Sequence, residues 1–310
     1  MTLYKFASAD IGLRILRDRL IRFTQPPALN DPFDSKPLVS DFFSGDQLRP
    51  FIEGMSSNEG VVQYASDKVL SDYYEKLPPL LRARFTFAQW AEYARPLAFA
   101  ALQRYLDNEG MTLPDIVKKR MSDNAEFHRR NTEHMLQDAI SKYLGVLSLS
   151  AECNHNLLWA HYADAHKGVA IGFDQCHLFF ADARKVEYVK SRPSISMREA
   201  VDSEEKAKKA AMSTLFTKNI DWDYEHEYRM VRPLANAQQS NQVDPFGFPI
   251  YLFRFPEACV HEVILGARIS PESVVFMKNC LSADSYKHIQ LFRAQCEPQG
   301  FSIQIFPETR

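Results

Sequence analysis

The sequence predicts an α+β protein, and three observations lead to that prediction. Segments typical of strands and of helices follow one another without the strict alternation of a doubly wound sheet. Neither G-x-G-x-x-G nor G-x-x-x-x-G-K-[ST] occurs, which argues against the common nucleotide-binding folds. Residues 42–143 differ from both flanks because they are rich in Tyr, Gln, Arg, Glu and Met at helical spacing. We therefore expect one α+β domain over residues 1–310 with a helical insertion over 42–143.

The first elements are predicted to run strand, helix, strand and rigid loop. Residues 2–8 are short, apolar and aromatic, which favours a strand, and residues 10–20 carry apolar side chains at helical spacing, with Asp10 as the expected N-cap. Residues 21–37 begin as a strand and contain four prolines, which prevent regular structure.

After the insertion the pattern alternates irregularly between strands and helices. Residues 169–174 form an apolar run that fits a central strand, and Gly168 and Ser270 are expected to end one helix and begin another. The other predicted strands and the predicted helices are strands 145–150, 183–190, 223–233, 248–256, 259–268 and 300–307, and helices 156–168, 196–218 and 270–282.

Composition and charge narrow the class of protein. The 310 residues contain 37 Lys and Arg against 39 Asp and Glu, which argues against a main role in coating nucleic acid or an anionic membrane. No apolar run approaches the roughly 18 residues that a membrane helix needs. Because no membrane helix is predicted, we expect a cytoplasmic protein without a membrane partner. The five cysteines include no C-x-x-C pair, so we expect reduced thiols.

The segment DYEHEYRMVRP, residues 223–233, places charges at every second position. In a strand, Glu225, Glu227 and Arg229 would share one face. Neighbouring carboxylates disfavour each other's ionisation unless a cation or ligand lies between them, and Arg229 is a candidate for that cation. A solvated strand edge with a salt bridge is the alternative.

Two further segments carry polar groups suited to ligand binding. Asn30 and Asp31 precede Pro32, so they either fold an Asx-turn or present amide and carboxylate groups to a cleft. Ser148 and Ser150 fall on one face of the predicted strand 145–150. Their hydroxyls suit a sugar or phosphate, although strand serines also occur without a ligand.

The segment WAHYADAHKG concentrates aromatic and imidazole groups. Trp159, His161 and Tyr162 either stack on a planar ligand or pack in the core. His161 and His166 are five residues apart, which is the wrong angle on a helix for one metal ion. We expect no metal site here.

The segments LYKF, FTQPPALNDPFD, GVLSLSAECNHNLLWAHYADAHKGVAIGFD and WDYEHEYRMVRP resemble, in order and spacing, a large bacterial family described as a domain of unknown function. This resemblance covers roughly residues 3–34 and 145–270. The order of elements is also similar, more distantly, to ADP-ribosyltransferases of the Arg-Ser-Glu type. The motif positions of that superfamily would correspond here to Lys5, Ser148, Ser150, Glu225 and Glu227.

The second resemblance implies a split β-sheet core that binds NAD as substrate between two small sheets. Lys5, Ser148 and Ser150 would hold the phosphates and the nicotinamide ribose. Glu227 would stabilise the cationic sugar as nicotinamide leaves, while Glu225 orients or deprotonates the nucleophile. Lysine stands where that branch has arginine, and it cannot make the same bidentate phosphate contact.

The expected function is therefore that of an ADP-ribosyltransferase or NAD glycohydrolase of a bacterial defence, toxin or effector type. Its acceptor is unknown, and an antitoxin or defence-system protein is an expected partner. Glu227 and Glu225 are the predicted catalytic residues. The predicted ligand-binding residues are Lys5, Asn30, Asp31, Ser148, Ser150, Trp159, His161, Tyr162 and Arg229.

Two other functions stay open. One is a binding module for a nucleotide or protein partner that performs no chemistry. The other is a metal-dependent phosphodiesterase or nuclease with oxygen ligands from Asp31, Asp34, Glu225 and Glu227. A chelator would inactivate the nuclease and leave the transferase unaffected.

Overall fold

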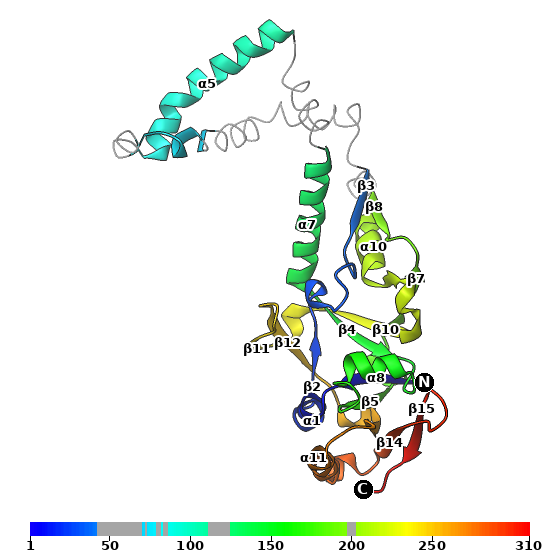
Figure 1. Cartoon of the computed structure of the whole chain (residues 1–310). Helices are drawn as coiled ribbons and strands as arrows, with labels where there is room; N and C mark the ends of the chain where they lie inside the picture. The colour runs from blue at the N-terminus through cyan, green and yellow to red at the C-terminus, as the bar shows by residue number, and fades with distance from the viewer. Residues whose placement is uncertain (42–69, 72, 79–81, 83–85, 111–124, 197–202) are drawn as a thin grey trace. The chain divides into compact units, whose positions relative to one another are not determined.

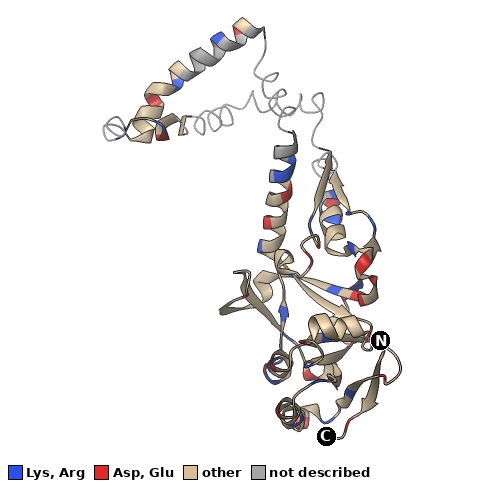
Figure 2. Ribbon diagram, in the orientation of Figure 1, with Lys and Arg blue, Asp and Glu red and all other residues tan. Residues whose placement is uncertain are grey.

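The structure is a computed structural model that describes residues 1–41, 70–71, 73–78, 82, 86–110, 125–196 and 203–310 (Figure 1). The chain divides into two compact units. The first comprises residues 1–38, 133–195 and 199–310, and the second comprises residues 39–132 and 196–198. Acidic and basic residues are interspersed along the described elements (Figure 2).

The described part of the second unit is mainly helical. Helix α5 (Phe87–Glu109) contains Pro96, and α7 (Ala125–Tyr143) begins in this unit and ends in the first. The ring of Tyr74 packs against Phe87 and Trp90. Helices therefore occur in the range predicted as an insertion, and the boundaries of that insertion stay a prediction.

The first unit contains a mixed eight-stranded sheet. All of its strand pairs are antiparallel except β13 with β14. Its strands are, in spatial order, β15 (Ile303–Pro307), β14 (Gln290–Cys296), β13 (Val260–Leu265), β5 (Val169–Asp174), β1 (Thr2–Ala7), β4 (Leu144–Ser150), β10 (Glu227–Pro233) and β6 (Arg184–Lys185).

Smaller sheets accompany this large sheet. Thr24, next to β2, exchanges two backbone hydrogen bonds of 2.8 Å with Val146 of β4. The small sheets are β11 (Gln238–Val243), β12 (Pro249–Arg254) and β2 (Leu20–Phe23); parallel β7 (Glu187–Val189) and β9 (Thr217–Asn219); and β3 (Leu38–Asp41) with β8 (Ser194–Ser196).

Helices cover both faces of the large sheet. Successive side chains of a strand point to opposite faces, and both faces are buried here. Val169 and Ile171 of β5 belong to the core cluster that includes residues of α1 (Ala9–Asp18) and α11 (Pro271–Leu281). Ala170 points to the other core cluster, where α8 (Asn156–Tyr162) packs. The apolar run predicted as a central strand is therefore central.

The remaining helices of the first unit are one α-helix and several short 3₁₀ helices. Helix α10 (Glu204–Leu215) begins at Ser203, whose side chain accepts a hydrogen bond from the Lys206 amide. The 3₁₀ helices are η1 (Pro26–Ala28), η2 (Leu178–Phe180), η3 (Ile220–Glu225), η4 (Leu234–Asn236), η5 (Glu257–Cys259) and η6 (Asp284–Tyr286). Across the described residues, no helix is long and apolar enough to cross a membrane.

Two predicted helix ends are wrong. Ser8 rather than Asp10 caps α1, because the Ser8 hydroxyl accepts from the Ile11 amide at 3.4 Å. Helix α8 ends at Tyr162 rather than near Gly168, since residues 164–166 all have left-handed φ angles of 47° to 70°. Gly168 is needed for close packing instead: a Cβ there would lie 2.0 Å from the carbonyl oxygen of Ala7.

Other differences concern strands. The predicted strand 223–233 begins only at Glu227, because the preceding residues form η3. The predicted strand 183–190 is divided by buried Val186 into β6 and β7. Sequence patterns did not predict β3, β8, β9, β11 and β14. In particular, the predicted helix 196–218 ends at Leu215, and Thr217 and Lys218 belong to β9. The first part of the predicted helix 196–218 lies outside the described residues.

Candidate functional site

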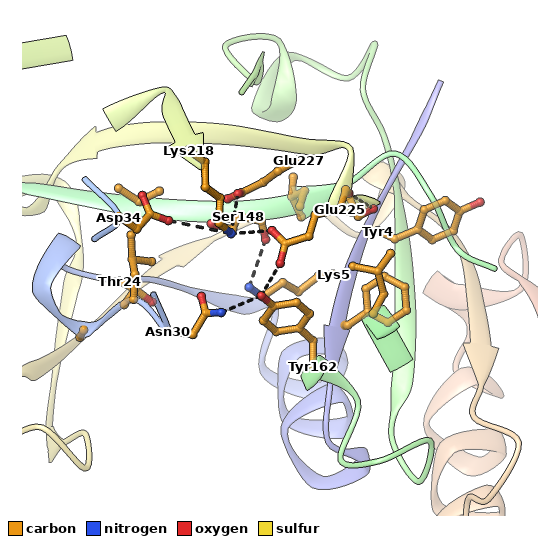
Figure 3. Close-up of a pocket in the computed structure, with 17 residues that line it drawn as sticks. Tyr4, Lys5, Thr24, Asn30, Asp34, Ser148, Tyr162, Lys218, Glu225 and Glu227 are labelled. Carbon is orange, nitrogen blue, oxygen red and sulfur yellow. Dashed lines mark hydrogen bonds and ion pairs between the residues drawn. The ribbon is translucent and has the colours of Figure 1, made fainter. Parts of the chain in front are cut away.

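A cavity of about 200 Å³ lies in the first unit between β1, β4, η3 and the loop after β2 (Figure 3). Its polar walls include Lys5, Asn30, Asp34, Ser148, Tyr162, Lys218, Glu225 and Glu227. Four of these eight residues were predicted to bind a ligand and two, Glu225 and Glu227, to be catalytic. The eight come from five separate segments of the chain.

The cavity forms where two neighbouring strands of the large sheet diverge. β1 pairs with β5 along its whole length, and β10 pairs with β4 from end to end. In contrast, β1 and β4 share a single registered pair, Tyr4 with Ser150. Next to that pair, where the strands have separated, Lys5 Nζ donates to the carbonyl oxygen of Ser148 at 3.1 Å.

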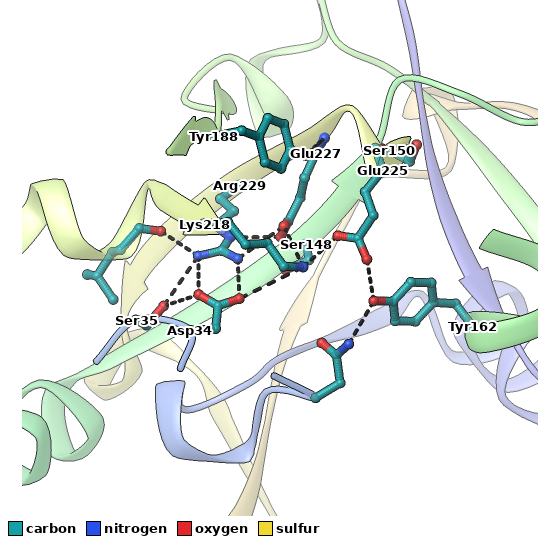
Figure 4. A network of polar contacts seen from close by, with 12 residues as sticks. Asp34, Ser35, Ser148, Ser150, Tyr162, Tyr188, Lys218, Glu225, Glu227 and Arg229 are labelled. Atoms are coloured by element: carbon teal, nitrogen blue, oxygen red, sulfur yellow. Dashed lines mark hydrogen bonds and ion pairs between the residues drawn. The ribbon is translucent and has the colours of Figure 1, made fainter. Parts of the chain in front are cut away.

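Five ionised side chains form a connected cluster beside the cavity: Asp34, Lys218, Glu225, Glu227 and Arg229 (Figure 4). We call this cluster the ion network. Each of the five is buried. Buried charges are stable only when they are paired and hydrogen-bonded, so the arrangement depends on all of its members.

Arg229 organises the inner end of the ion network. Its Nε and Nη2 donate to the Glu227 carboxylate at 2.7 and 3.0 Å. Its Nη1 and Nη2 donate to the two Asp34 oxygens at 2.8 and 2.5 Å. Nη1 also donates to the carbonyl oxygen of Leu215 at 2.8 Å. The guanidinium thus makes two bidentate pairs and joins β10, the end of α10 and the loop after β2.

Lys218 of β9 organises the end nearer the cavity. Its Nζ donates to Glu225 Oε2 at 2.5 Å and to Glu227 Oε2 at 3.2 Å. The Tyr162 hydroxyl donates to Glu225 Oε1 at 2.5 Å, and the Asn30 amide donates to that hydroxyl at 2.8 Å. Glu225 is therefore held from two sides, by an ammonium and by a phenol.

The two glutamates have opposite pKa shifts. Burial raises the pKa of Glu225 more than Lys218 lowers it. For Glu227, Arg229 and Lys218 together outweigh burial and lower the pKa to about 2. Glu227 therefore stays a carboxylate, whereas Glu225 is the group better suited to take up a proton.

The ion network carries a net charge of −1, because three carboxylates face two cations, Lys218 and Arg229. Burial lowers the pKa of Lys5, across the cavity, to about 8, so this lysine is still largely protonated at neutral pH and offsets that charge. A cationic or electron-poor group is favoured beside the carboxylates of Glu225 and Glu227 rather than beside Lys5.

The predicted shared face of Glu225, Glu227 and Arg229 is partly wrong. Glu227 and Arg229 alternate on β10 as expected, but Glu225 is the last residue of η3. His226 adopts a left-handed conformation with φ 40° between them, so Glu225 reaches the ion network through a turn. Sequence reasoning missed Lys218 because nothing local distinguishes it from the lysines of the preceding helix.

The two predicted serines differ in what their hydroxyls do. Ser148 contributes to the lowered pKa of Glu227 and lines the cavity. The Ser150 hydroxyl donates to the carbonyl oxygen of Glu225 at 2.6 Å and accepts from the Glu152 amide at 2.9 Å. Ser150 thus fixes the end of η3, which places Glu225.

The loop before Pro32 divides its two predicted residues between two environments. Asn30 lines the cavity, whereas Asp31 does not and instead accepts a hydrogen bond from the Phe33 amide at 2.8 Å. The Asx-turn alternative is confirmed for Asp31. Asp34, which was considered only as a metal ligand, is the loop residue that binds Arg229.

Two of the three predicted stacking residues lie outside the cavity. Trp159 is fully buried, its ring contacts Phe6 edge-on, and its Nε1 donates to the carbonyl oxygen of Cys153 at 2.7 Å. The core-packing alternative is therefore correct for Trp159. His161 is exposed and its ring lies 6.3 Å from that of Trp222, whereas Tyr162 lines the cavity.

Three of the four carboxylates considered in the metal-dependent alternative, Asp34, Glu225 and Glu227, meet in the ion network, whereas Asp31 lies outside it. Their oxygens are paired with Lys218 and Arg229. Among the described residues, no group of three or more His, Cys, Asp or Glu side chains is placed to hold a metal ion.

Residues 158–230 match the family model described as "Protein of unknown function (DUF2971)". The matched range runs from α8 to β10 and contains Tyr162 and four of the five members of the ion network. No curated protein and no solved structure matches the chain. The resemblance to a family of unknown function is thus supported over residues 158–230, and no comparison supports the ADP-ribosyltransferase relation.

Proposed function

We propose that this protein cleaves the bond between nicotinamide and ribose in NAD and transfers the ADP-ribosyl group to an acceptor or to water. One observation carries the proposal. Lys5, Ser148 and Glu227 come from β1, β4 and β10, three strands adjacent in the sheet, and line one cavity. These are the positions at which the ADP-ribosyltransferase resemblance expects a basic residue, a serine and a glutamate.

The charge of the cavity suits this reaction. When the bond between C1′ and the pyridinium nitrogen breaks, its electron pair moves to nitrogen, nicotinamide leaves as a neutral molecule, and the ribosyl group becomes cationic. Glu227 is held ionised beside Ser148 and would stabilise that cation. Because the ion network already carries a net charge of −1, the developing cation improves its balance.

Glu225 is the proposed proton acceptor. An acceptor oxygen or nitrogen that attacks C1′ must lose a proton, and burial raises the pKa of Glu225 toward the range useful for a base. Tyr162 and Lys218 fix the two oxygens of this carboxylate. Burial and the Glu225 charge raise the pKa of Tyr162, so its hydroxyl stays protonated and donates.

The size of the cavity limits what it holds. Its volume of about 200 Å³ is below the roughly 300–1,000 Å³ of typical ligand pockets. We therefore assign it to the nicotinamide riboside part of NAD, with the remainder outside. Lys5 and Asn30 would contact the ribose. Tyr162 is the aromatic side chain proposed to lie beside the nicotinamide ring, because Trp159 is buried outside the cavity.

The test is to incubate the full chain with NAD, with and without bacterial lysate, and to follow free nicotinamide and ADP-ribose mass addition. Glu227→Gln removes one of the three carboxylate charges that line the cavity. Glu257→Gln is the matched control, because Glu257 is also paired with an arginine, Arg19, but lies outside the cavity. We expect nicotinamide release from wild type and the control and none from Glu227→Gln.

The outcomes separate three functions. Release without mass addition indicates a glycohydrolase, and release with mass addition indicates a transferase. NAD binding without release would favour a binding module. If no nicotinamide is released and calorimetry detects no NAD binding, the proposal is overturned. The antitoxin or defence-system partner stays a prediction.

A further inference from the structure

A second cavity, of about 190 Å³, adjoins the first and has an excess of basic side chains. The two share Asp34 and Lys218 as lining residues. The second cavity is otherwise built from residues after Asp31, from the segment after β7 and from the end of α10 with β9. It contains none of Lys5, Ser148 and Glu227.

Basic side chains dominate its wall. Lys36, Lys190 and Arg192 line this cavity together with Lys218. Within the described part of the chain, none of the first three has a carboxylate at ion-pair distance. Lys36 and Arg192 are half-buried residues, and Lys190 is exposed.

The two carboxylates of the wall do not neutralise these cations. Asp31 accepts the Phe33 amide, and Asp34 is bound by Arg229 from behind the wall. Lys218 is likewise paired with Glu225 and Glu227, so three cations that have no ion pair among the described residues, Lys36, Lys190 and Arg192, face one carboxylate, Asp31, an excess of +2. A ligand with about two negative charges would balance this excess.

An aromatic ring stands beside these cations. The Phe33 side chain is 62% exposed although it lines the cavity, and the Arg192 guanidinium lies 5.8 Å from its ring centroid. A large apolar ring left in water next to unpaired cations offers a stacking surface for a base, as in sites that bind nucleotides.

We propose that the second cavity binds the phosphates of a nucleoside diphosphate through Lys36, Lys190 and Arg192, with the base stacked on Phe33. The volume admits the phosphate groups, while the base lies at the exposed ring. This inference does not depend on the NAD-cleaving activity, because it uses none of the proposed catalytic residues.

Calorimetry on the full chain with ADP and with inorganic diphosphate tests the proposal. The variant Lys36→Gln/Arg192→Gln should weaken binding of both ligands about tenfold or more. Phe33→Ala should weaken ADP and leave diphosphate unchanged. Lys167→Gln/Arg268→Gln is the matched control, since both residues are exposed and line neither cavity. Thermal unfolding of each variant verifies that it is folded.

The first cavity provides the counter-test. Lys5→Gln should leave ADP binding intact. If Lys5→Gln abolishes ADP binding while Lys36→Gln/Arg192→Gln does not, ADP occupies the first cavity and the proposal is overturned. Equal affinity for ADP and diphosphate, with no effect of Phe33→Ala, would overturn the assignment to a nucleotide. Absence of binding by either ligand would refute the site.

Discussion

The two ends of the ion network use the same chemistry in different surroundings. At the inner end, Arg229 binds Asp34 and Glu227 through two bidentate pairs and is fully buried. At the outer end, Glu225 is held by single contacts from Lys218 and Tyr162 beside a cavity. The inner end therefore joins segments of the fold, and the outer end remains accessible to a ligand.

The largest expected effect comes from breaking the inner end. Arg229→Met leaves two buried carboxylates without their main cation, which should cost about 3–5 kcal/mol in the free energy of unfolding. Urea denaturation measures it. Arg17→Met is the control, because its pair with Asp18 is exposed to solvent and its loss should leave the stability nearly unchanged. Similar losses in both variants would contradict a structural role for the inner end.

Glu227 belongs to both ends, and its pKa predicts a dependence on pH. Its pKa is lowered from 4.5 to about 2, a shift equivalent to about 3 kcal/mol. This stability is present above the unfolded-state pKa and is lost as the pH falls through the folded-state pKa. The stability gap between wild type and Glu227→Gln should therefore be largest above pH 4.5 and shrink toward pH 2. A gap that is constant over this range would show that Glu227 is not held ionised.

Tyr162→Phe should have a smaller effect on stability. It removes one donated hydrogen bond to Glu225 and leaves the ring in place, so the loss should be about 1 kcal/mol. Because that bond lowers the pKa of Glu225, its removal should raise this pKa further. Titration of the Glu225 carboxyl by NMR measures the shift. A lower pKa in the variant would mean that Tyr162 does not donate to the carboxylate.

Glu225→Gln should change stability least, with a sign opposite to that of Glu227→Gln. The pKa of Glu225 is raised, so the unfolded chain releases this proton at lower pH than the folded protein does. Wild type should therefore lose stability relative to Glu225→Gln as the pH rises above 4.5. Unfolding of both proteins across that range checks the direction, and a relative gain for wild type would show that Lys218 outweighs burial.

The sequence predicted the inner end better than the outer one. Glu227 and Arg229 are two residues apart, and the period of a strand places them together without knowledge of the rest of the fold. Glu225 continues the same alternation, yet the left-handed turn at His226 ends the strand before it. An alternating pattern does not separate a strand from a short 3₁₀ turn.

Long-range partners were the part that no local pattern could show. Asp34 lies 195 residues from Arg229, and nothing around it distinguishes a partner of Arg229 from a metal ligand. Trp159 shows the reverse error, because a tryptophan among polar residues was considered for stacking although it packs in the core. The α+β class and the central position of β5 followed from local patterns. The mixed eight-stranded sheet did not, because the expected core was split between two small sheets.

The divergence of β1 and β4 after the Tyr4–Ser150 pair affects how mutations act on the cavity. Part of the cavity floor is main chain, such as the carbonyl oxygen of Ser148 that Lys5 contacts. Substitution of a side chain leaves a peptide group unchanged. Alanine scanning of this floor should therefore give graded losses at many positions. Full loss should be confined to residues such as Glu227, whose charge no peptide group replaces.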